Sequence, residues 1–497
     1  MSGPVPVRRL PLVLTPDPTR VISRPYIPGD PGPVGGHARV RRIVEQVLAL
    51  PDESAAATLA GVRRDFAGRY TDLEAVLQAG FDEVSRRVPT ADGLSVDTQR
   101  LIGSYFVHEY SLQAAALTNP SLVLAPDQSG LAEGSVRFVA SLRAVGEGHI
   151  SSIEFRHGVL DADGEVTIDA PAQPITGTRR TPTFEKRAFA AKLAEIDADD
   201  ELVDEVIDQL DEHFSMEQLE AALHALETSG QPTEHTRVVV NTIHWLAASN
   251  YELHFPPASE LSARVIFPQG PAESRGMEDA RFVRLVQDDG SVVYYATYTA
   301  FDGFHVLPQL IETSDFLSFR IATISGAAAQ NKGIALFPRL VGGHYAALAR
   351  SDNENNYVMF SDHLRTWDSS ERLQVPTFPW ELIQIGNSGA PIETDAGWLV
   401  ITHGVGPVRT YALGAILLDL DDPTKVIGHL DRPLLAAAED EREGYVPNVV
   451  YSCGQLLHGN TLLIAYGASD TGARFATVEL DVLLDELLAS GSLPERP

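Results

Sequence analysis

Two adjacent carboxylates, Glu278 and Asp279, lie between Gly276 and Arg281 at the start of a β-branched run. The like charge of Glu278 and the opposite charge of Arg281 would change the proton affinity of Asp279 in opposite directions. Asp279 is therefore a candidate general acid. The alternative is a turn carboxylate that caps backbone amides and pairs with Arg281.

The elements that would position this pair repeat along the chain. Each repeat is an apolar β-rich run, a turn containing Gly or Asn, and a second such run. The repeats span Ser135–Ile168, Arg281–Ile324, Gly333–Leu373, Gly389–Ile427 and Asn448–Leu484. Their length is typical of propeller blades. We therefore predict a mainly β protein whose catalytic domain, residues 119–485, is a five-bladed β-propeller.

The remaining segments are expected to be extended or helical. Residues 1–37 are rich in Pro and Gly and should be extended, and 38–118 shows helical periodicity. Within that module, Val96–Leu117 is predicted as one longer helix. A second helical block at about 184–228 becomes an insertion between the first and second blades, with a solvated acidic face. Residues 486–497 are expected to form a C-terminal tail.

A propeller binds ligands where its inner strands converge, so polar residues at the starts of those strands are the candidates. By position these are Asn119, Ser121, Arg143, Glu278, Asp279, Arg281, Asn331, Lys332, Arg350, His403 and Asp470. This mixture of donors and acceptors suits the hydroxyl groups of a carbohydrate. There is no Gly-rich phosphate loop before a helix and no His-rich spacing for a metal, so we expect no metal or other cofactor.

Composition limits the classes of partner. The 497 residues carry a formal net charge of -30, which argues against nucleic acid and anionic membranes as partners. A single cysteine, Cys453, excludes an intrachain disulfide and a cysteine-based zinc site. The sequence has neither an apolar run of membrane-spanning length nor a signal-like N-terminus, so we expect a cytoplasmic protein. A homo-oligomer is compatible with these features.

The run Gly276–Arg281 resembles the Gly-x-Glu-Asp-Pro-Arg motif of glycoside hydrolase family 130, the β-mannoside phosphorylases and β-mannosidases, which have a five-bladed propeller fold. Other segments resemble the family in the same order: Ser141–Arg143 with Ile150–Ile153, Asn331–Pro338, Phe360–Trp367, Gly397–Gly404, Tyr411–Pro423, Val446–Asn448 and Tyr466–Asp470. The resemblance covers about 119–170 and 250–480. The helical regions lie outside it.

The resemblance implies roles for individual residues. Asp279 matches the catalytic acid of an inverting enzyme, which in the phosphorylases passes its proton through a sugar hydroxyl. The substrate side comprises Asn119, Ser121, Arg143, Glu278, Arg281 and Asp470. The phosphate or water side comprises Asn331, Lys332, Arg350, His403 and Tyr411, together with Gln330 and Gln384. A small oligosaccharide is the implied substrate, and inorganic phosphate is the co-substrate if the protein is a phosphorylase.

Departures from the family motif bear on the reaction. Ala280 replaces the proline, and Gln330 and Gln384 replace two basic residues that help to hold phosphate. Glutamine attracts an anion far less than a cation does, so the sequence favours a β-mannosidase-like hydrolase. The general base would then come from Glu273, Glu381 or Glu393. The alternatives are a β-mannoside phosphorylase releasing mannose 1-phosphate and a non-catalytic carbohydrate-binding propeller.

Overall fold

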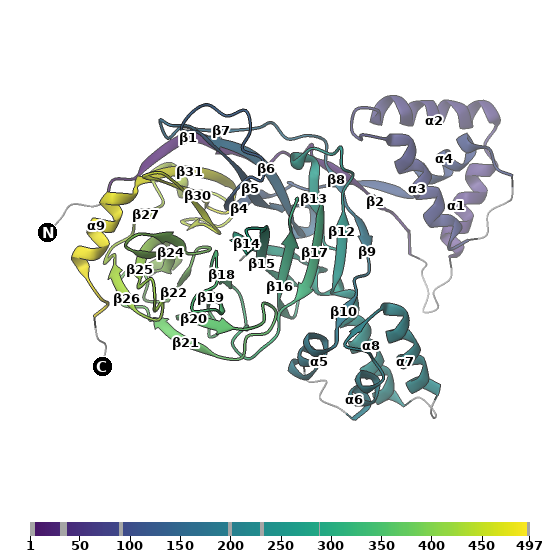
Figure 1. The fold of residues 1–497 in the computed structure, drawn as a ribbon. Helices are drawn as coiled ribbons and strands as arrows, with labels where there is room; N and C mark the ends of the chain where they lie inside the picture. Colours follow the sequence, from purple (N-terminus) through teal and green to yellow (C-terminus); the bar gives the residue numbers. More distant parts are fainter. Residues whose placement is uncertain are drawn as a thin grey trace. The chain divides into compact units, whose positions relative to one another are not determined.

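A computed structural model describes residues 5–29, 37–88, 93–196, 201–228, 233–287 and 289–494. The chain divides into two compact units (Figure 1). The larger, β-rich unit comprises Met1–Pro16, Ala115–Pro171 and Thr176–Pro497, and the smaller, helical unit comprises Asp17–Ala114 and Ala172–Ile175. Residues 1–4 and 30–36 of the expected extended segment, and 495–497 of the expected tail, lie outside the described residues.

The helical unit contains four helices and a two-stranded ribbon within its described residues. The helices are α1 (Ala38–Leu48), α2 (Asp52–Phe66), α3 (Leu73–Ser85) and α4 (Val96–Ser104), and the ribbon pairs β2 (Val21–Pro25) with β3 (Val107–Ser111). Asp72 caps α3 and Ser95 caps α4, each accepting a backbone N–H. Buried apolar side chains from all four helices form one core.

The long helix predicted over Val96–Leu117 is wrong. α4 ends at Ser104, and Tyr105 and Phe106 donate backbone hydrogen bonds to the third residue back, which tightens the final turn. The chain then becomes β3, whose backbone groups pair with β2 in a ladder that the local apolar periodicity did not reveal. Tertiary pairing therefore overrode a local helical pattern.

The β-rich unit consists of sheets in which strands that follow one another in sequence pair mostly antiparallel. The largest sheet has the order β4-β5-β6-β14-β15-β16-β17-β12-β9, with β7, β8 and β13 paired at its side; the others are β18-β19-β20-β21, β22-β24-β25-β26 with β23 and β27, and β1-β31-β30-β28 with β29. The bounds are β4 Ala116–Leu124, β5 Val136–Val145, β6 Ser151–Leu160, β7 Val166–Ile168, β8 Ile175–Thr176, β9 Thr178–Arg180, β12 Tyr251–His254, β13 Arg264–Ile266, β14 Gly276–Val286, β15 Val292–Phe301, β16 Val306–Thr313 and β17 Ser318–Thr323.

The remaining strands complete the later sheets. They are β18 Ala335–Leu336, β19 Tyr345–Ala349, β20 Asn356–Ser361, β21 Ser370–Gln374, β22 Gln384–Asn387, β23 Ile392–Thr394, β24 Gly397–Val405, β25 Tyr411–Leu418, β26 Val426–His429, β27 Leu435–Ala436, β28 Val450–Tyr451, β29 Gln455–His458, β30 Thr461–Ala468 and β31 Gly472–Glu479. The N-terminal strand β1 (Arg8–Leu14) pairs antiparallel with β31 and belongs to the last sheet.

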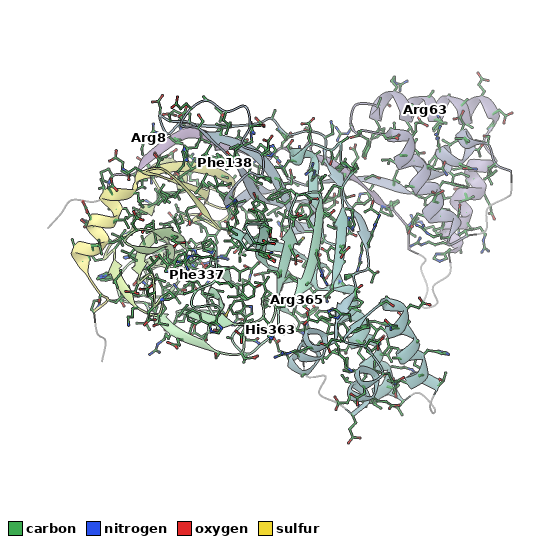
Figure 2. The ribbon with its side chains drawn as sticks, viewed as in Figure 1. Arg8, Arg63, Phe138, Phe337, His363 and Arg365 are labelled. Atoms are coloured by element: carbon green, nitrogen blue, oxygen red, sulfur yellow. The ribbon has the colours of Figure 1, made fainter. Side chains whose placement is uncertain are left out.

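Apolar side chains fill the spaces between neighbouring sheets. One cluster joins β14–β16 to β18–β20, a second joins β19–β21 to β24 and β25, a third joins β24 and β25 to β28, β30 and β31, and a fourth joins β4–β6 to β1, β30 and β31. Phe337 and Phe138, labelled in Figure 2, belong to the second and fourth clusters. The burial of large apolar side chains between sheets is the main stabilisation of this unit.

A helical insertion follows the first strands of the β-rich unit. It comprises the strand pair β10 (Phe184–Glu185) and β11 (His213–Phe214) with α5 (Lys186–Glu195), α6 (Glu201–Asp208), α7 (Met216–Thr228) and α8 (Glu234–Ala248). The predicted block at 184–228 ends too early, because Thr233 caps a further helix whose Val239, Ile243 and Leu246 join the same core. At the other end of the chain, α9 (Leu480–Ser490) continues through residues expected in the tail.

No helix within the described ranges is long and apolar enough to cross a membrane. Short 3-10 turns occur at Glu147–His149, Leu261–Ala263, Pro271–Glu273, Pro407–Arg409 and Glu439–Glu441.

Candidate active site

The carboxylate pair lies on β14, where that strand is irregular. Glu278 pairs with Thr299 of β15 and Arg281 pairs with Thr297, so two residues on β14 stand opposite one on β15. This is a β-bulge, and Asp279 within it has a φ of 56°. A β-bulge redirects side chains at the edge of a sheet, and a strained non-glycine residue is frequent at functional sites.

A matching bulge occurs on β4. Thr118 pairs with Arg143 of β5 and Ser121 pairs with Ser141, which leaves Asn119 in the bulge with a φ of 49°. The Asn119 Nδ2 atom donates a hydrogen bond of 2.6 Å to Oδ1 of Asp279. One carboxylate oxygen of Asp279 is thus oriented by the neighbouring strand, and Oδ2 remains as the oxygen that can carry a transferable proton.

Glu278 is held between two cations. Its Oε1 atom accepts a hydrogen bond of 2.8 Å from Arg143, and its Oε2 atom accepts one of 2.6 Å from Lys332. Burial alone would raise the pKa of Glu278, but the charges of Arg143 and Lys332 hold the pKa below its usual value. Arg143 also lies 3.8 Å from Oδ1 of Asp279. Glu278 is therefore an ionised carboxylate that positions cations, while Asp279 remains available for chemistry.

Two guanidinium groups are buried close to this pair. Arg281 is 2% exposed and donates a hydrogen bond of 2.6 Å to the hydroxyl of Tyr451, and Arg350 is 6% exposed and donates one of 3.1 Å to the Asn353 carbonyl. The Nε atoms of both arginines are buried without a hydrogen-bond partner. Buried, under-satisfied N–H donors on cations are costly unless an anion occupies the space beside them.

His403 lies beside these two arginines as a neutral ring. Its Nδ1 atom lies 2.9 Å from the Asn387 carbonyl, which can only accept, so Nδ1 carries the proton in the neutral ring. Burial, Arg350 and Arg281 together hold the pKa of His403 well below its usual value. The buried Nε2 atom has no hydrogen-bond partner. This nitrogen is therefore an acceptor, and it becomes a stronger base when an anion offsets the two arginines.

A third carboxylate, Asp470, is partly buried near the carboxylate of Asp279. Burial and the nearby Asp279 charge raise the pKa of Asp470 to about 6. Its φ of 49° follows that of Ser469 at 47°, so the backbone here is also left-handed. Asp470 can therefore exchange a proton close to neutral pH.

These side chains line one cavity of about 390 Å³. Its walls are Asn119, Arg143, Glu278, Asp279, Lys332, Arg350, Asn353, Gln384, His403, Arg409, Tyr411, Val446, Val449, Tyr451 and Asp470. The volume is in the range of small-molecule sites, and its lining is polar and charged rather than apolar. The cavity can hold a small sugar with an anion beside it.

Most of the predicted site residues meet here, and four do not line the cavity. Arg281 and Asn331 instead border a hollow of about 10 Å³ beside Asp279. The Ser121 hydroxyl accepts the backbone N–H of Phe282 at 3.0 Å and so joins β4 to β14. The Gln330 amide donates to Glu195 at 2.9 Å, outside the cavity.

None of the three glutamates predicted as a general base lines the cavity. Glu273 is fully buried and accepts hydrogen bonds from the Tyr251 and Tyr298 hydroxyls, and burial raises its pKa. Glu381 accepts the backbone N–H groups of two residues of its own turn, Thr377 and Phe378. Glu393 forms a partly exposed ion pair with Arg339. All three are structural.

The sequence interpretation missed five residues that line the cavity. Asn353, Arg409, Val446, Val449 and Tyr451 come from turns or from the region around β28. Arg409 follows a Gly-Pro turn and has a φ of 56°, and the Gly-Pro pair was the signal that could have placed it at a hairpin tip. Tyr451 carried no such signal, because its contact with Arg281 joins strands of two different sheets.

Among the described residues, no group of three or more His, Cys, Asp or Glu side chains is arranged to hold a metal ion.

Comparisons with known proteins agree with the resemblance. Residues 238–488 match the family model of glycoside hydrolase family 130, described as beta-1,4-mannooligosaccharide phosphorylase. A 1,2-beta-oligomannan phosphorylase of Thermoanaerobacter sp. strain X514 is 35% identical over 227 residues, which cover 44% of this chain and 74% of the relative. A beta-1,2-mannobiose phosphorylase of Listeria innocua is 30% identical over 229 residues, which cover 45% of this chain and 63% of the relative.

A solved structure of beta-1,2-mannobiose phosphorylase from Listeria innocua, in complex with beta-1,2-mannobiose, matches 76% of this chain and 93% of that one, with 20% identity and a TM-score of 0.45. The family match spans half of the chain, and the aligned region contains the Glu278-Asp279 pair. The chain therefore belongs to glycoside hydrolase family 130, and it is a glycoside phosphorylase or a glycoside hydrolase.

Proposed function

We propose that the protein is an inverting β-mannoside phosphorylase that transfers a mannosyl group to inorganic phosphate. The observation that carries the proposal is the pair Arg350 and His403, which line the cavity and have buried nitrogen atoms that lack partners, with the buried guanidinium of Arg281 beside the cavity. This arrangement suits a phosphate oxyanion better than it suits water, because phosphate brings negative charge to the buried guanidinium of Arg350 and a neutral water molecule does not.

This proposal replaces the preference for hydrolysis. That preference depended on Gln330 and Gln384 and on a glutamate acting as general base. Gln330 instead binds Glu195 outside the cavity, and none of the three candidate glutamates reaches it. Gln384 does line the cavity, where its amide can donate to a phosphate oxygen. The relatives reported above are named as phosphorylases, which also supports phosphorolysis.

In the proposed reaction, a phosphate oxygen attacks the anomeric carbon from the side of Arg350 and His403. The bond between that carbon and the glycosidic oxygen breaks, and the leaving oxygen receives the proton of Asp279, directly or through a sugar hydroxyl. Inversion of a β-mannoside yields α-mannose 1-phosphate and a shortened acceptor. Asn119 orients Asp279, and the cations around Glu278 fix the side chains next to the bond that breaks.

We further propose that the β-rich unit is a five-bladed propeller. Five antiparallel groups support this: β4–β7, β14–β17, β18–β21, β22 with β24–β26, and β28 with β30, β31 and β1. Apolar clusters between successive groups, together with the β6–β14 pairing, connect them in a ring. In this arrangement the bulged residues Asn119 and Asp279 face the central channel.

The test is product analysis with β-1,2- and β-1,4-mannobiose, each with and without inorganic phosphate. Mannose 1-phosphate that forms only when phosphate is present supports the proposal. Equal release of free mannose with and without phosphate would identify a hydrolase. The proton NMR spectrum of the first product formed distinguishes the α from the β anomer and so tests inversion.

A further inference from the structure

The helical insertion reaches the catalytic region through one carboxylate. Glu195 is the last residue of α5, and its side chain is 19% exposed. Its Oε1 atom accepts hydrogen bonds from Nε2 of Gln330 at 2.9 Å and from Nζ of Lys192 at 3.0 Å, and its Oε2 atom accepts the backbone N–H of Gly326 at 3.0 Å. Three donors therefore converge on one carboxylate, and two of them belong to the loop between β17 and β18 rather than to the insertion.

Glu195 places a carboxylate at the carboxyl end of α5, which is an unfavourable position for a negative charge. The carboxyl end of a helix carries partial negative charge, so a carboxylate there is destabilised unless other groups compensate. Lys192 supplies a positive charge from the previous turn, and burial lowers the pKa of this lysine, whose side chain is 2% exposed. Glu195 and Lys192 thus depend on each other, and the N–H donors of the neighbouring loop complete the arrangement.

The loop that Glu195 binds, Gly326–Gly333, leads directly into the active site. Gly326 has a φ of 111°, and a Cβ atom there would lie 2.1 Å from the Trp367 carbonyl oxygen, so only glycine fits. Ala329 donates its N–H to the Gly326 carbonyl at 3.0 Å, which closes the first turn. The hydrogen bond from Gly326 to Glu195 therefore fixes the point from which this loop starts.

The same loop ends with residues of the cavity. Lys332 donates a hydrogen bond of 2.6 Å to Glu278, and Asn331, with a φ of 62°, donates from its side chain to the Ser351 carbonyl. Lys332 is 41% exposed and has a flexible stem, so its position depends on the backbone that presents it. Between Gly326 and Lys332, the polar side-chain contact to the insertion is that of Gln330 with Glu195.

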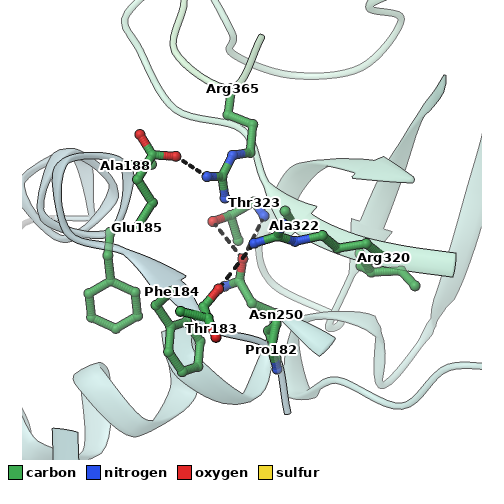
Figure 3. A pocket seen from close by; sticks show the side chains of 12 residues that line it. Pro182, Thr183, Phe184, Glu185, Ala188, Asn250, Arg320, Ala322, Thr323 and Arg365 are labelled. Carbon is green, nitrogen blue, oxygen red and sulfur yellow. Dashed lines mark hydrogen bonds and ion pairs between the residues drawn. The ribbon is translucent and has the colours of Figure 1, made fainter. Parts of the chain in front are cut away.

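A second contact attaches the insertion elsewhere. Arg365 pairs with Glu185 at the start of the insertion, and Arg320 donates a hydrogen bond of 3.0 Å to the Thr183 carbonyl (Figure 3). These contacts hold the insertion against β17 and the turn after β20. They do not involve the Gly326–Gly333 loop, so they provide a matched control for the effect of Glu195.

We propose that Glu195 is a positioning residue, through which the helical insertion aligns the Gly326–Gly333 loop and thereby places Lys332 in the phosphorylase site. Within the loop, the side chain of Gln330 makes the hydrogen bond with Glu195. The inference concerns this chain's insertion, and its kinetic part rests on the proposed phosphorolysis.

The first test does not depend on the reaction. In Glu195→Gln, the new amide faces the N–H donors of Gly326 and Gln330 with a donor of its own, so at least one hydrogen bond is lost. We expect hydrogen–deuterium exchange of the segment 326–333 to rise in this variant. Glu185→Ala should increase exchange at the start of the insertion instead. Unchanged exchange at 326–333 in Glu195→Gln would overturn the proposal, whatever reaction the enzyme catalyses.

The second test is kinetic and uses a side-chain exchange. Glu195→Gln should lower kcat/KM for phosphate on the order of tenfold, because small misplacements of site residues are costly. The KM for the mannoside should change much less. In the double variant Glu195→Gln/Gln330→Glu, the amide now on α5 accepts from Gly326 and donates to the carboxylate now on the loop. The amide–carboxylate pair is thereby restored in reverse, while Lys192 still lacks its carboxylate partner on α5. The value of kcat/KM should therefore recover in part and exceed that of Glu195→Gln alone.

Several outcomes would count against a positioning role. Equal losses in Glu195→Gln and Glu185→Ala would show a general loosening of the insertion. If kcat/KM of the double variant is no higher than that of Glu195→Gln alone, the hydrogen bond with Gln330 does not carry the effect of Glu195 on the loop. If the parent enzyme forms no mannose 1-phosphate, the proposed function fails, and the exchange measurement still decides whether Glu195 orders the loop.

Discussion

Asn119 and Asp279 occupy bulges on two different strands, both have left-handed backbones, and the amide of the first donates a hydrogen bond of 2.6 Å to the carboxylate of the second. In a regular strand, successive side chains point to opposite faces of the sheet. Without the bulges, the Asn119 amide and the Asp279 carboxylate would therefore not meet. The bulges bring an amide donor and a carboxylate together, and the strain at both positions is the cost of that arrangement.

Asp279→Asn should reduce kcat by about 10²- to 10⁴-fold, the usual contribution of a general acid. The loss should be smaller for an aryl mannoside whose leaving group needs no proton, because such a bond breaks without acid assistance. Initial rates with mannobiose and with a nitrophenyl mannoside measure the difference. Asp289→Asn, which alters an exposed turn carboxylate that accepts from Ser291, is the control and should retain full activity. Full turnover by Asp279→Asn would refute the assignment.

Asn119 contributes both a side-chain donor and a backbone with positive φ, and two variants separate these contributions. Asn119→Gly removes the amide and keeps the left-handed conformation accessible, so the melting temperature should change little while kcat falls. Asn119→Ala adds backbone strain of roughly 1 kcal/mol and should also lower the melting temperature. Calorimetry combined with initial rates tests both expectations. Activity retained in Asn119→Gly would mean that Asp279 does not need the amide.

Arg350→Gln should raise the KM for phosphate by about tenfold or more, because it removes a charge-assisted donor from a buried site. The KM for the mannoside should respond less. Arg339→Gln is the matched control, since Arg339 pairs with Glu393 at a partly exposed position outside the cavity. Phosphate titrations at saturating mannoside provide the measurement. An equal rise of both KM values would place Arg350 on the sugar side instead.

A substitution at Gly386 tests the region around Arg350 and His403 without changing a charged residue. A Cβ atom at this position would lie 2.2 Å from Cδ of Arg350 and 2.9 Å from Cε1 of His403. Because both side chains are buried, Gly386→Ala should displace them and weaken phosphate binding with little effect on sugar binding. Gly61→Ala, in an open position on α2, should leave the kinetics unchanged. Wild-type phosphate affinity in Gly386→Ala would show that the cluster adjusts freely.

The raised pKa of Asp470 predicts that the stability of the protein depends on pH. Its pKa is about 6 in the folded protein against the usual 3.8, so the folded state binds the proton more tightly and ionisation of Asp470 destabilises the fold. The cost is on the order of 3 kcal/mol above pH 6 and disappears as the pH falls toward 4. Asp470→Asn should therefore be more stable than the parent at pH 8, and this advantage should vanish near pH 4. A constant difference in melting temperature across this range would contradict the assignment.

The position of Asp279, that of its neighbours and most of the cavity lining could be predicted from the sequence, because these residues belong to short motifs in which residue type and position along a strand carry the information. Tyr451 could not, since its hydroxyl meets Arg281 only where the fold brings together two residues that are 170 positions apart in the chain. Ser121 shows the same limit. It lies on a predicted inner strand, yet the bulge at Asn119 leaves the Ser121 hydroxyl bonded to Phe282 and away from the cavity.

The sequence-based predictions that the structure does not support failed for related physical reasons. The segment 96–117 has a helical apolar pattern, and only the pairing of β3 with β2 shows that part of it is a strand. Gln330 replaces a basic residue of the family motif, and nothing in the residues around it indicates that Glu195, from a separate helix, is its partner. Local patterns identify chemistry, whereas contacts between distant segments decide which groups are left free to perform it.

The pairing of β1 with β31 makes the last sheet depend on segments synthesised far apart in time. Arg8 lies opposite Thr477, so β1 cannot pair until the segment that contains β31 has been synthesised. During synthesis on the ribosome, Arg8–Leu14 therefore remains an unpaired strand, and a chaperone or another nascent chain can capture it. Closure of this sheet is then a late folding step, and a truncated chain lacking β31 should aggregate rather than accumulate as a stable intermediate.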